Sequence, residues 1–529
     1  MRFILAALLF ALSGLATAAP PRGFDARVEA LMKQQGVPGA AIAIVENGKV
    51  TLARGYGHKR IDSTDPVGAD TLFQIGSTTK AFTAAALAIL VDEGKIRWDD
   101  PVIEHLPGFR MYDPWVTREI TIRDLLVHRS GLGRGQGDLL FVPATSLSRA
   151  ETVRRLRYLK PATSFRSAFA YDNILYIVAG ELIEAVSGQR WEDFVRDRLL
   201  RPIGMMTSVT NDVDRLVAPD RAFPHGRLGE IRGTGPLQAF DEDTAALGAN
   251  SAPAGAIASG ANELARWLQV QLSGGMLPGS DQRLYSEANG REMWQPVMPI
   301  PVTPLPEPLA ALMPQFRGYA LGWIAQDYLG QRVLQHGGGT LGFITIVVLV
   351  PEKNLGFAIV TNAEEFAFVP GLQYELLDHY LGQEKKDWPK AFAEFFAQRS
   401  TAGLEAVRKA ATERPQSQPS LPLAAYAGQF SDPWYGPIEI REVAGQLAID
   451  FLQTPGMAGP LEHWAYDTFV ARWPNPLTEP AFVTFSLDAA GKPARITMKA
   501  VSPVADFSFD YHDLEFTPVV TPSTPPATP

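Results

Sequence analysis

A polar, proline-rich stretch divides this chain into two parts with different hydrophobic patterns. The stretch covers residues 413–422, reads ERPQSQPSLP, and follows a helix-like segment over residues 392–412. This composition is typical of a linker, because proline breaks regular structure and the polar residues add nothing to a core. At 529 residues the chain is also longer than one hydrophobic core usually supports. We therefore expect a large domain over residues 19–390, a helix and linker over 391–422, and a smaller domain after it.

The residues before the linker mix strand-like and helix-like patterns. Two strand-like runs, residues 40–46 and 49–54, flank the pair Asn47-Gly48, which is typical of a tight hairpin. Apolar periodicity predicts helices over three further segments, residues 81–92, 174–186 and 191–200.

The residues after the linker form short runs in which apolar side chains alternate with polar or small ones. Such runs occur at residues 447–451, 496–500 and 507–511. A period of two is the pattern of half-buried strands. We therefore predict an all-β domain over residues 423–517, a small barrel or a sandwich. The Thr/Pro/Ser-rich residues 518–529 predict a disordered tail.

The first residues have the pattern of a secretory signal. Arg2 precedes an uncharged apolar run over residues 3–12, and Ala16-Thr17-Ala18 supplies a small-x-small cleavage site. A membrane anchor is the alternative, but the run is short for ~30 Å of hydrocarbon. We expect a signal peptide over residues 1–18, a periplasmic or secreted mature protein, and no stable membrane insertion after cleavage.

The composition excludes several classes of function. The chain has 48 Lys and Arg against 57 Asp and Glu, a net charge of -9, which argues against a nucleic-acid partner. It has no cysteine, which removes disulfides, thiolate nucleophiles and iron–sulfur clusters. Its eight histidines form no His-Glu-x-x-His pattern. We expect neither a metal site nor a cofactor.

One Ser-x-x-Lys sequence occurs in the chain, from Ser77 to Lys80. Residues 81–91 are almost wholly apolar, so a helix here should be buried on all sides. The spacing of three puts the serine and the lysine on one helical face. A serine hydroxyl needs a neighbour to take its proton, and a lysine in apolar surroundings has a lowered pKa suited to that task. The alternative is a serine cap followed by a surface lysine, which the spacing alone does not exclude.

Two further short motifs occur once each, in a fixed order after the first. Tyr171-Asp172-Asn173 stands before a predicted helix, and His336-Gly337-Gly338-Gly339 precedes a strand-like run at residues 344–350. With these three motifs the chain resembles the serine hydrolases of the β-lactamase and penicillin-binding-protein superfamily. The branch most similar to it holds class C β-lactamases, D-aminopeptidases and related esterases. The resemblance covers about residues 24–381.

The resemblance implies a fold and a role for each motif residue. The fold is α/β (α+β), an antiparallel sheet flanked by helices, with the site between the sheet and a helical lobe. Ser77 attacks a carbonyl and becomes acylated, while Lys80 and Tyr171 act as one coupled unit, and which of them is the general base stays open. The remaining implied roles are substrate binding by Asn173 and Gly338, and an oxyanion hole formed by the N–H groups of Ser77 and Gly339.

His336 departs from the pattern of class C β-lactamases and D,D-peptidases. Those members carry Lys-Thr-Gly here, with a cation facing the substrate carboxylate, whereas histidine is mostly neutral at pH 7. Gly337 also removes the hydroxyl. The departure favours the D-aminopeptidase, amidase and esterase members, and His336 remains a candidate catalytic residue.

The leading hypothesis is therefore an exported serine peptidase or amidase that cleaves short linear peptides, including those with D- or unusual residues. In size and motif placement the chain is similar to bacterial peptidases that degrade linearised microcystin. The alternatives are a broad-specificity esterase, a β-lactamase, or a penicillin-binding sensor that is acylated without turnover. The role of the β-rich domain and the oligomeric state, a homo-oligomer included, stay open. The loops at residues 133–145 and 299–314, which we expect to line the cleft, cannot be placed from the sequence.

Overall fold

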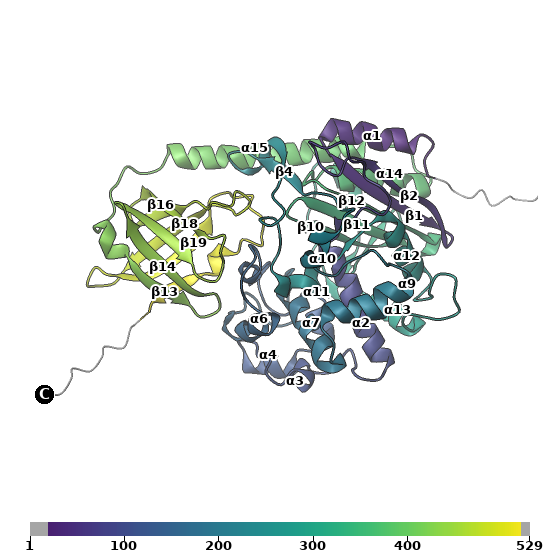
Figure 1. Cartoon of the computed structure of the whole chain (residues 1–529), viewed down its shortest axis with the longest axis horizontal. Helices are drawn as coiled ribbons and strands as arrows, with labels where there is room; N and C mark the ends of the chain where they lie inside the picture. The colour runs from purple at the N-terminus through teal and green to yellow at the C-terminus, as the bar shows by residue number, and fades with distance from the viewer. Residues whose placement is uncertain (1–19, 520–529) are drawn as a thin grey trace, which may run out of the picture.

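The computed structural model describes residues 20–519, which form two domains joined by a long helix (Figure 1). The first domain combines a sheet with helices, and the second is a β-barrel. Helix α15 (Trp388–Thr412) runs from the first domain toward the barrel, and a non-helical stretch follows it. The predicted signal peptide lies outside the described residues, as does the part of the predicted tail from residue 520 onward.

An eight-stranded antiparallel sheet forms the centre of the first domain. Its order is β2-β1-β12-β11-β10-β9-β8-β7, so the hairpin at the start of the domain pairs with the last strand. The antiparallel sheet expected from the resemblance is confirmed. The strands are β1 (Gly39–Glu46), β2 (Lys49–Gly57), β7 (Met298–Pro299), β8 (Arg317–Tyr319), β9 (Ile324–Tyr328), β10 (Gln331–Thr340), β11 (Phe343–Val350) and β12 (Leu355–Thr361).

The predicted hairpin at Asn47-Gly48 is confirmed. Glu46 pairs with Lys49, which leaves a two-residue turn between the strands. Both turn residues have positive φ, 50° and 76°, as the tight turn of a hairpin requires. Asparagine and glycine tolerate this conformation better than other residues, so the local sequence sets the register of β1 against β2.

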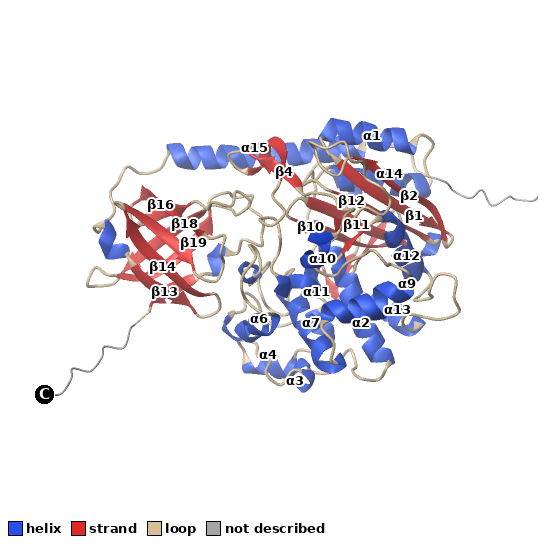
Figure 2. Cartoon of the chain, in the orientation of Figure 1, coloured by secondary structure: helices blue, strands red, loops and turns tan. Residues whose placement is uncertain are grey.

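Helices cover both faces of the sheet (Figure 2). Helices α1 (Phe24–Gln35) and α14 (Phe368–Tyr380) pack on one face, and α12 (Ala261–Leu272) packs on the other with the helical lobe. The helices predicted from periodicity are confirmed, and the last of them continues from an α-helix into a π-turn (Arg196–Leu200). The lobe contains α2 (Thr79–Asp92), α3 (Val102–His105), α4 (Pro114–Glu119), α5 (Ile122–Leu125), α6 (Arg149–Arg155), α7 (Ile174–Ser187), α8 (Trp191–Val195), α9 (Arg201–Ile203), α10 (Asp212–Val217), α11 (Ala252–Gly255) and α13 (Glu287–Met293). No helix within residues 20–519 combines the length and the apolar character that crossing a membrane requires.

The second domain is a closed eight-stranded barrel, so the β-rich prediction resolves to a barrel. Each strand pairs with the next along the chain, and Phe430 in the first strand pairs with Pro518 in the last. Pro518, which the sequence analysis placed at the start of the tail, thus ends the final strand. The strands are β13 (Gly428–Asp432), β14 (Gly436–Val443), β15 (Gln446–Phe451), β16 (Ala458–Ala465), β17 (Thr468–Ala471), β18 (Ala481–Leu487), β19 (Pro493–Ala500) and β20 (Glu515–Pro518).

The strand predicted at residues 507–511 is wrong. This segment belongs to the β19–β20 loop, and Tyr511 begins a 3-10 turn. The side chains of Phe509 and Tyr511 are buried in the barrel core, whereas Phe507 packs on the first domain. The alternation thus arose from two different packing partners and not from the two faces of a strand.

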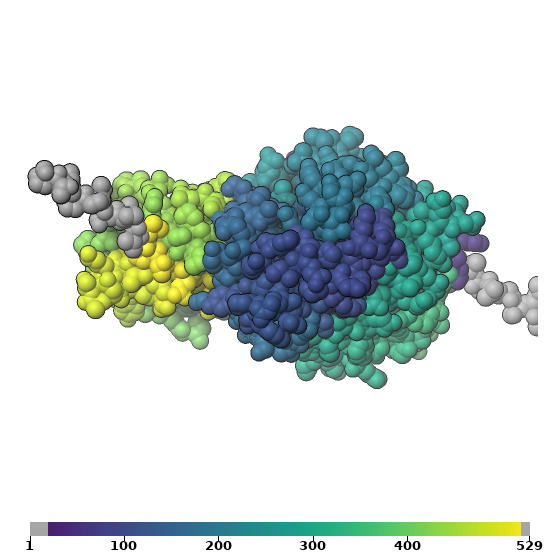
Figure 3. All heavy atoms as spheres, turned by 90° about the horizontal axis from the view of Figure 1, so that it is seen from below, coloured from purple at the N-terminus to yellow at the C-terminus, as the bar shows by residue number. Residues whose placement is uncertain are grey.

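The two domains touch along an extensive interface. Figure 3 shows the yellow atoms of the barrel against the dark blue atoms of the first domain. Asp510 of the barrel accepts hydrogen bonds from the backbone N–H groups of Gly137 (2.7 Å) and Leu139 (3.0 Å). Arg155 of α6 donates to the carbonyl of Trp434 at 3.2 Å. The barrel is therefore bonded to the first domain at several points.

Candidate active site

Ser77 lies in a 3-10 turn (Gly76–Thr78) directly before α2. The turn is pressed against β10, since a Cβ on Gly76 would lie 2.8 Å from the backbone N of Gly339. Gly76 also has a φ of +51°, a left-handed conformation that favours glycine. The glycine-rich strand and the glycine before the serine together allow this close approach, which places the serine beside β10.

Lys80 is fully buried, and its ammonium nitrogen has three hydrogen-bond acceptors. Nζ donates to the Oγ of Ser77 (2.9 Å), the Oδ1 of Asn173 (2.7 Å) and the carbonyl of Ala254 (2.9 Å). A charged lysine carries three hydrogens, so every one is used. The surrounding helix α2 is buried from Thr79 to Leu90, as predicted.

The pKa of Lys80 is lowered to about 7. Burial is the main cause, because an apolar environment penalises the charged amine, and the negative charges of Asp138 and Asp172 oppose the shift. Near neutral pH the charged and neutral forms are therefore both populated. The neutral amine has a lone pair that can accept the hydrogen of Ser77 in place of donating to it.

Tyr171 stands beside the same two groups. Its ring centroid is 5.0 Å from the Nζ of Lys80, and its hydroxyl shares a hydrogen bond with Ser77. Burial raises the pKa of the phenol, and the bond to Ser77 opposes the rise. The ring of His128 lies against it, with centroids 4.2 Å apart. Serine, lysine and tyrosine from two distant stretches of sequence thus converge.

Both ends of the Asn173 amide are engaged inside the protein. Its Oδ1 accepts from Lys80, and its Nδ2 donates to the Oδ2 of Asp138 at 2.8 Å. The side chain is 9% exposed. The amide bonds to the lysine and to Asp138. The substrate contact that the family resemblance implies for this residue stays a prediction.

His336 is buried on β10 and bonded at both ring nitrogens. Nε2 lies 2.6 Å from the hydroxyl of Tyr319, and Nδ1 lies 2.7 Å from the carbonyl of Gly337. Because a carbonyl only accepts, Nδ1 carries the hydrogen and Nε2 accepts from the tyrosine. Burial, together with the charge of Lys80, lowers the pKa of His336 to about 3. This position therefore supplies no positive charge at neutral pH.

The glycines after His336 alternate between exposed and buried positions. Gly337 and Gly339 are exposed, while Gly338 is buried. A Cβ on Gly338 would lie 2.0 Å from the carbonyl oxygen of Ile75 and 2.4 Å from the Oγ1 of Thr345. Gly338 lets the serine turn pack on the strand, and its part in binding substrate stays a prediction.

Several residues at the site escaped the sequence analysis. Asp138 is completely buried, and burial raises its pKa to about 7. It accepts from Asn173 and, at 2.8 Å, from the hydroxyl of Ser508 in the barrel. His128 and Tyr319 support the motif residues from outside the motifs. A buried aspartate on a glycine-rich loop gives no distinctive sequence pattern.

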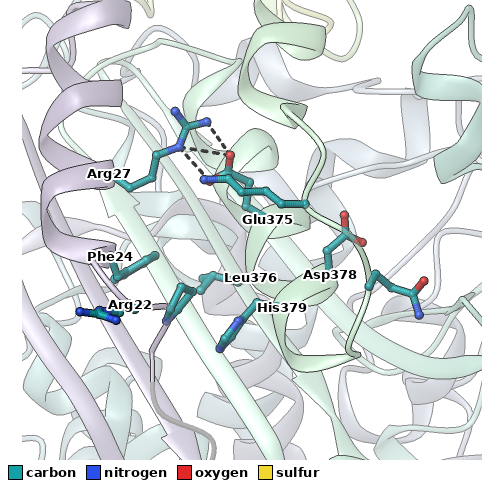
Figure 4. A pocket seen from close by; sticks show the side chains of 10 residues that line it. Arg22, Phe24, Arg27, Glu375, Leu376, Asp378 and His379 are labelled. Carbon is teal, nitrogen blue, oxygen red and sulfur yellow. Dashed lines mark hydrogen bonds and ion pairs between the residues drawn. The ribbon is translucent and has the colours of Figure 1, made fainter.

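A separate cavity of about 130 Å³ opens between α1 and α14, on the sheet face away from α2 (Figure 4). Arg27 and Glu375 form an ion pair at its edge, with the Nε of the arginine 3.2 Å from a carboxylate oxygen. Phe24 and Leu376 supply apolar lining. The motif residues are absent from the lining of this cavity, so it is distinct from the Ser77 site.

An antiparallel sheet with a helical lobe, and a serine bonded to a buried lysine, form the arrangement that the resemblance to β-lactamase-type serine hydrolases implies. Residues 24–381 match the family model described as Beta-lactamase, and residues 412–518 match a domain of unknown function, DUF3471. The chain therefore belongs to the β-lactamase family of serine hydrolases.

Similar proteins include hydrolases and penicillin-binding proteins. Unguisins hydrolase ungD' from Aspergillus campestris is 32% identical over 429 residues, covering 76% of this chain and 74% of the relative. Penicillin-binding protein 4 from Amycolatopsis lactamdurans is 30% identical over 382 residues, covering 69% of this chain and 91% of the relative. The solved octameric penicillin-binding protein homologue from Pyrococcus abyssi has a TM-score of 0.57 at 20% identity and covers 90% of this chain and 98% of its own. At this identity the likeness concerns the fold, and it extends over most of the chain.

Proposed function

We propose that the protein is a peptidase or amidase that cleaves short linear peptides through an acyl-enzyme on Ser77. The observation that carries this proposal is the 2.9 Å contact between the Nζ of Lys80 and the Oγ of Ser77, with the lysine pKa lowered to about 7. A serine is a weak nucleophile until a neighbour accepts its proton, and this lysine is placed and poised to do so.

The proposed reaction has two halves. In the first, Ser77 Oγ bonds to the substrate carbonyl carbon while its proton passes to the unit of Lys80 and Tyr171. The N–H groups of Ser77 and Gly339 stabilise the oxyanion, a role in which one donor contributes about 2.7–4 kcal/mol. The carbon–nitrogen bond then breaks, and the departing amine takes a proton delivered through Tyr171. In the second half, water attacks the ester carbon and gives a proton to the same unit. The bond between that carbon and Ser77 Oγ then breaks, the carboxylic acid leaves, and the unit returns the proton to Ser77.

Two observations favour peptides over β-lactams. The buried, neutral His336 stands where class C β-lactamases carry a lysine that faces the substrate carboxylate. A relative with 32% identity is named a hydrolase of unguisins, which supports hydrolysis as the reaction type. Peptides with D- or unusual residues, linearised microcystin among them, remain the predicted substrates.

The test is a screen of purified protein against short peptides with and without D-residues, with mass spectrometry locating the cleaved bond. Matched p-nitrophenyl esters and a penicillin are included. We expect turnover of amides, and a loss on the order of 10⁴- to 10⁶-fold for Ser77→Ala. Ser187→Ala, at the end of α7, is the control and should retain full activity. Ester turnover without amide turnover would favour the esterase, and a permanent adduct without turnover would favour the penicillin sensor.

Export and assembly remain predictions of the sequence. We infer that residues 1–18 direct export, which N-terminal sequencing of the mature protein from culture fractions would test. A homo-oligomer is tested by light scattering of the purified protein. An intact N-terminus on an intracellular protein would contradict export.

A further inference from the structure

We propose that Ser508 and Asp510, which lie on the barrel, are positioning residues of the catalytic site, because they hold Asp138 and through it the amide that orients Lys80. This inference rests on the proposed function, since it concerns how the same site is held together. It also gives the barrel a role that the sequence leaves open.

A continuous chain of hydrogen bonds leads from the barrel to the nucleophile. The hydroxyl of Ser508 donates to the Oδ2 of Asp138 at 2.8 Å, and the Nδ2 of Asn173 donates to the same oxygen at 2.8 Å. The Oδ1 of Asn173 then accepts from the Nζ of Lys80 at 2.7 Å, and Nζ reaches Ser77 at 2.9 Å. Four side-chain hydrogen bonds thus lead from the barrel to Ser77, and the first of them crosses between the two domains.

The aspartate decides which way the Asn173 amide faces. In its charged form the carboxyl of Asp138 only accepts, so the NH₂ group then points to Asp138 and the carbonyl oxygen points to Lys80. If the amide turned over, two donors would face each other at the lysine, and two acceptors would face each other at the aspartate. Asp138 is therefore a positioning residue for the lysine although the two side chains do not touch.

The barrel holds Asp138 through the backbone before and after it as well as through its side chain. Asp510 accepts from the backbone N–H groups of Gly137 and Leu139, the residues before and after Asp138. One barrel carboxylate thus fixes the backbone on which the aspartate stands. Without the barrel, the side chain and both flanking N–H groups would lose these partners.

Ser508 also affects the charge next to the lysine. Its hydrogen bond stabilises the charged form of Asp138 and so opposes the rise in the pKa of that carboxyl. The charge of Asp138 in turn favours the protonated form of Lys80. The other titratable groups next to the lysine or affected by its charge come from the first domain, namely Asp172, His128, His336, Tyr171 and Tyr176. Asp506 of the barrel acts on Asp138, because its charge raises the pKa of that carboxyl. Removing the Ser508 hydroxyl should therefore lower the pKa of Lys80.

Other contacts between the domains supply a control, because they hold the barrel without reaching this chain of bonds. The backbone N–H of Ser146 donates to the carbonyl of Gln453 at 3.0 Å, and its hydroxyl lies 3.5 Å from the same oxygen. Ser146→Ala removes a hydroxyl from the interface just as Ser508→Ala does. If the interface only held the two domains together, Ser508→Ala and Ser146→Ala would affect the reactivity of Ser77 equally.

The experiment compares the full-length protein with Ser508→Ala, Ser508→Thr and Ser146→Ala. The probe is a fluorophosphonate, and intact-mass spectrometry follows its addition to Ser77 from pH 5 to 9. We expect Ser508→Ala to slow the reaction about 10- to 100-fold, because a hydrogen bond to a charged group is lost. The pH midpoint of the reaction should move downward, because the pKa of Lys80 falls. Ser508→Thr retains a hydroxyl and should recover most of the rate, and Ser146→Ala should react like the unaltered protein. Equal rates and midpoints in all four proteins, or equal losses in Ser508→Ala and Ser146→Ala, would overturn the proposal.

A second measurement separates failure of this inference from failure of the proposed function. Lysine labelled at ¹⁵Nζ allows the titration of Lys80 to be followed by NMR without any turnover, with Lys80→Arg assigning its signal. If the unaltered protein does not react with the phosphonate, the proposed function fails. The NMR titration of Lys80 still tests the positioning role in that case. A lower Lys80 pKa in Ser508→Ala supports that role, and an unchanged one contradicts it.

Discussion

The ring of Phe507 in the barrel stands edge-on to the ring of Tyr171 in the first domain, with centroids 6.0 Å apart and planes at 81°. Phe507 also lies under the guanidinium of Arg134, whose Cζ is 4.5 Å from the ring centroid. The barrel thus borders the tyrosine that contacts Ser77. Its last loop is part of the surroundings of the site.

Replacing Tyr171 with phenylalanine should slow both acylation and deacylation by about 10²- to 10⁴-fold, the usual contribution of a general acid or base. The ring stays, so its packing on His128 is kept and the fold should be unchanged. Stopped-flow kinetics with an ester substrate separates the two steps. Tyr176→Phe is the matched control, because that ring lies 5.2 Å from the Nζ of Lys80 while its hydroxyl bonds to the carbonyl of Leu126. Similar losses in both variants would contradict the role of Tyr171.

The rate of Ser77 acylation should rise with pH around a midpoint near 7 and level off above it. Below its pKa of about 7 Lys80 is protonated and has no lone pair for the serine proton. Asp138 titrates in the same range, so the midpoint belongs to the coupled pair. The raised pKa of Tyr171 and the pKa of about 3 of His336 keep both from titrating between pH 6 and 8. A rate that is flat or falls across this range would contradict the assignment.

Gly338→Ala should destabilise the first domain by about 1–3 kcal/mol, the usual cost of overpacking. The new Cβ would lie 2.0 Å from the carbonyl oxygen of Ile75, so the serine turn must move off β10. Thermal unfolding measures the loss, and fluorophosphonate labelling of Ser77 should slow with it. Gly337→Ala is the control, since its Cβ would meet nothing closer than 3.7 Å. An unchanged unfolding temperature for Gly338→Ala would contradict the close packing of turn and strand.

Phe507→Ala should lower kcat/KM for peptides by about tenfold and change the hydrolysis of a small acetate ester much less. The ring lies beside Gly135 and Tyr171. We therefore expect it to contact an extended substrate but not a small ester. Steady-state kinetics with both substrates gives the ratio. Phe482→Ala, which removes an aromatic contact with Trp464 elsewhere on the barrel, should leave both rates alone. Equal losses of kcat/KM for the peptide and the ester would contradict a role of Phe507 that is specific to large substrates.

The sequence predicts the features that depend on local patterns. The apolar run after Lys80 predicts a helix buried on all sides, and α2 is that helix. Asn47-Gly48 predicts the hairpin because the turn needs two residues with positive φ. In both cases the residues that form the sequence pattern also form the helix or the turn that it predicts.

The features that the sequence could not predict depend on contacts between the domains. Asp138 on a glycine-rich loop has the pattern of a solvated residue, and the barrel loop that bonds to it lies far along the chain. Residues 507–511 alternate like a strand, but a period of two does not say which partner each side chain will meet. The orientations of Asn173 and His336 likewise follow from Asp138 and Tyr319, which lie outside the motifs.

The loop that bonds to Asp138 lies between β19 and β20, after every strand and helix of the first domain along the chain. During translation, the hydrolase domain can thus emerge and fold before its reactive centre has all its supports. A message cut short before residue 508 would yield a protein that keeps its nucleophile but lacks the barrel groups that position Asp138 and, through it, the lysine amine. Catalytic competence would then arrive only after the barrel has been made.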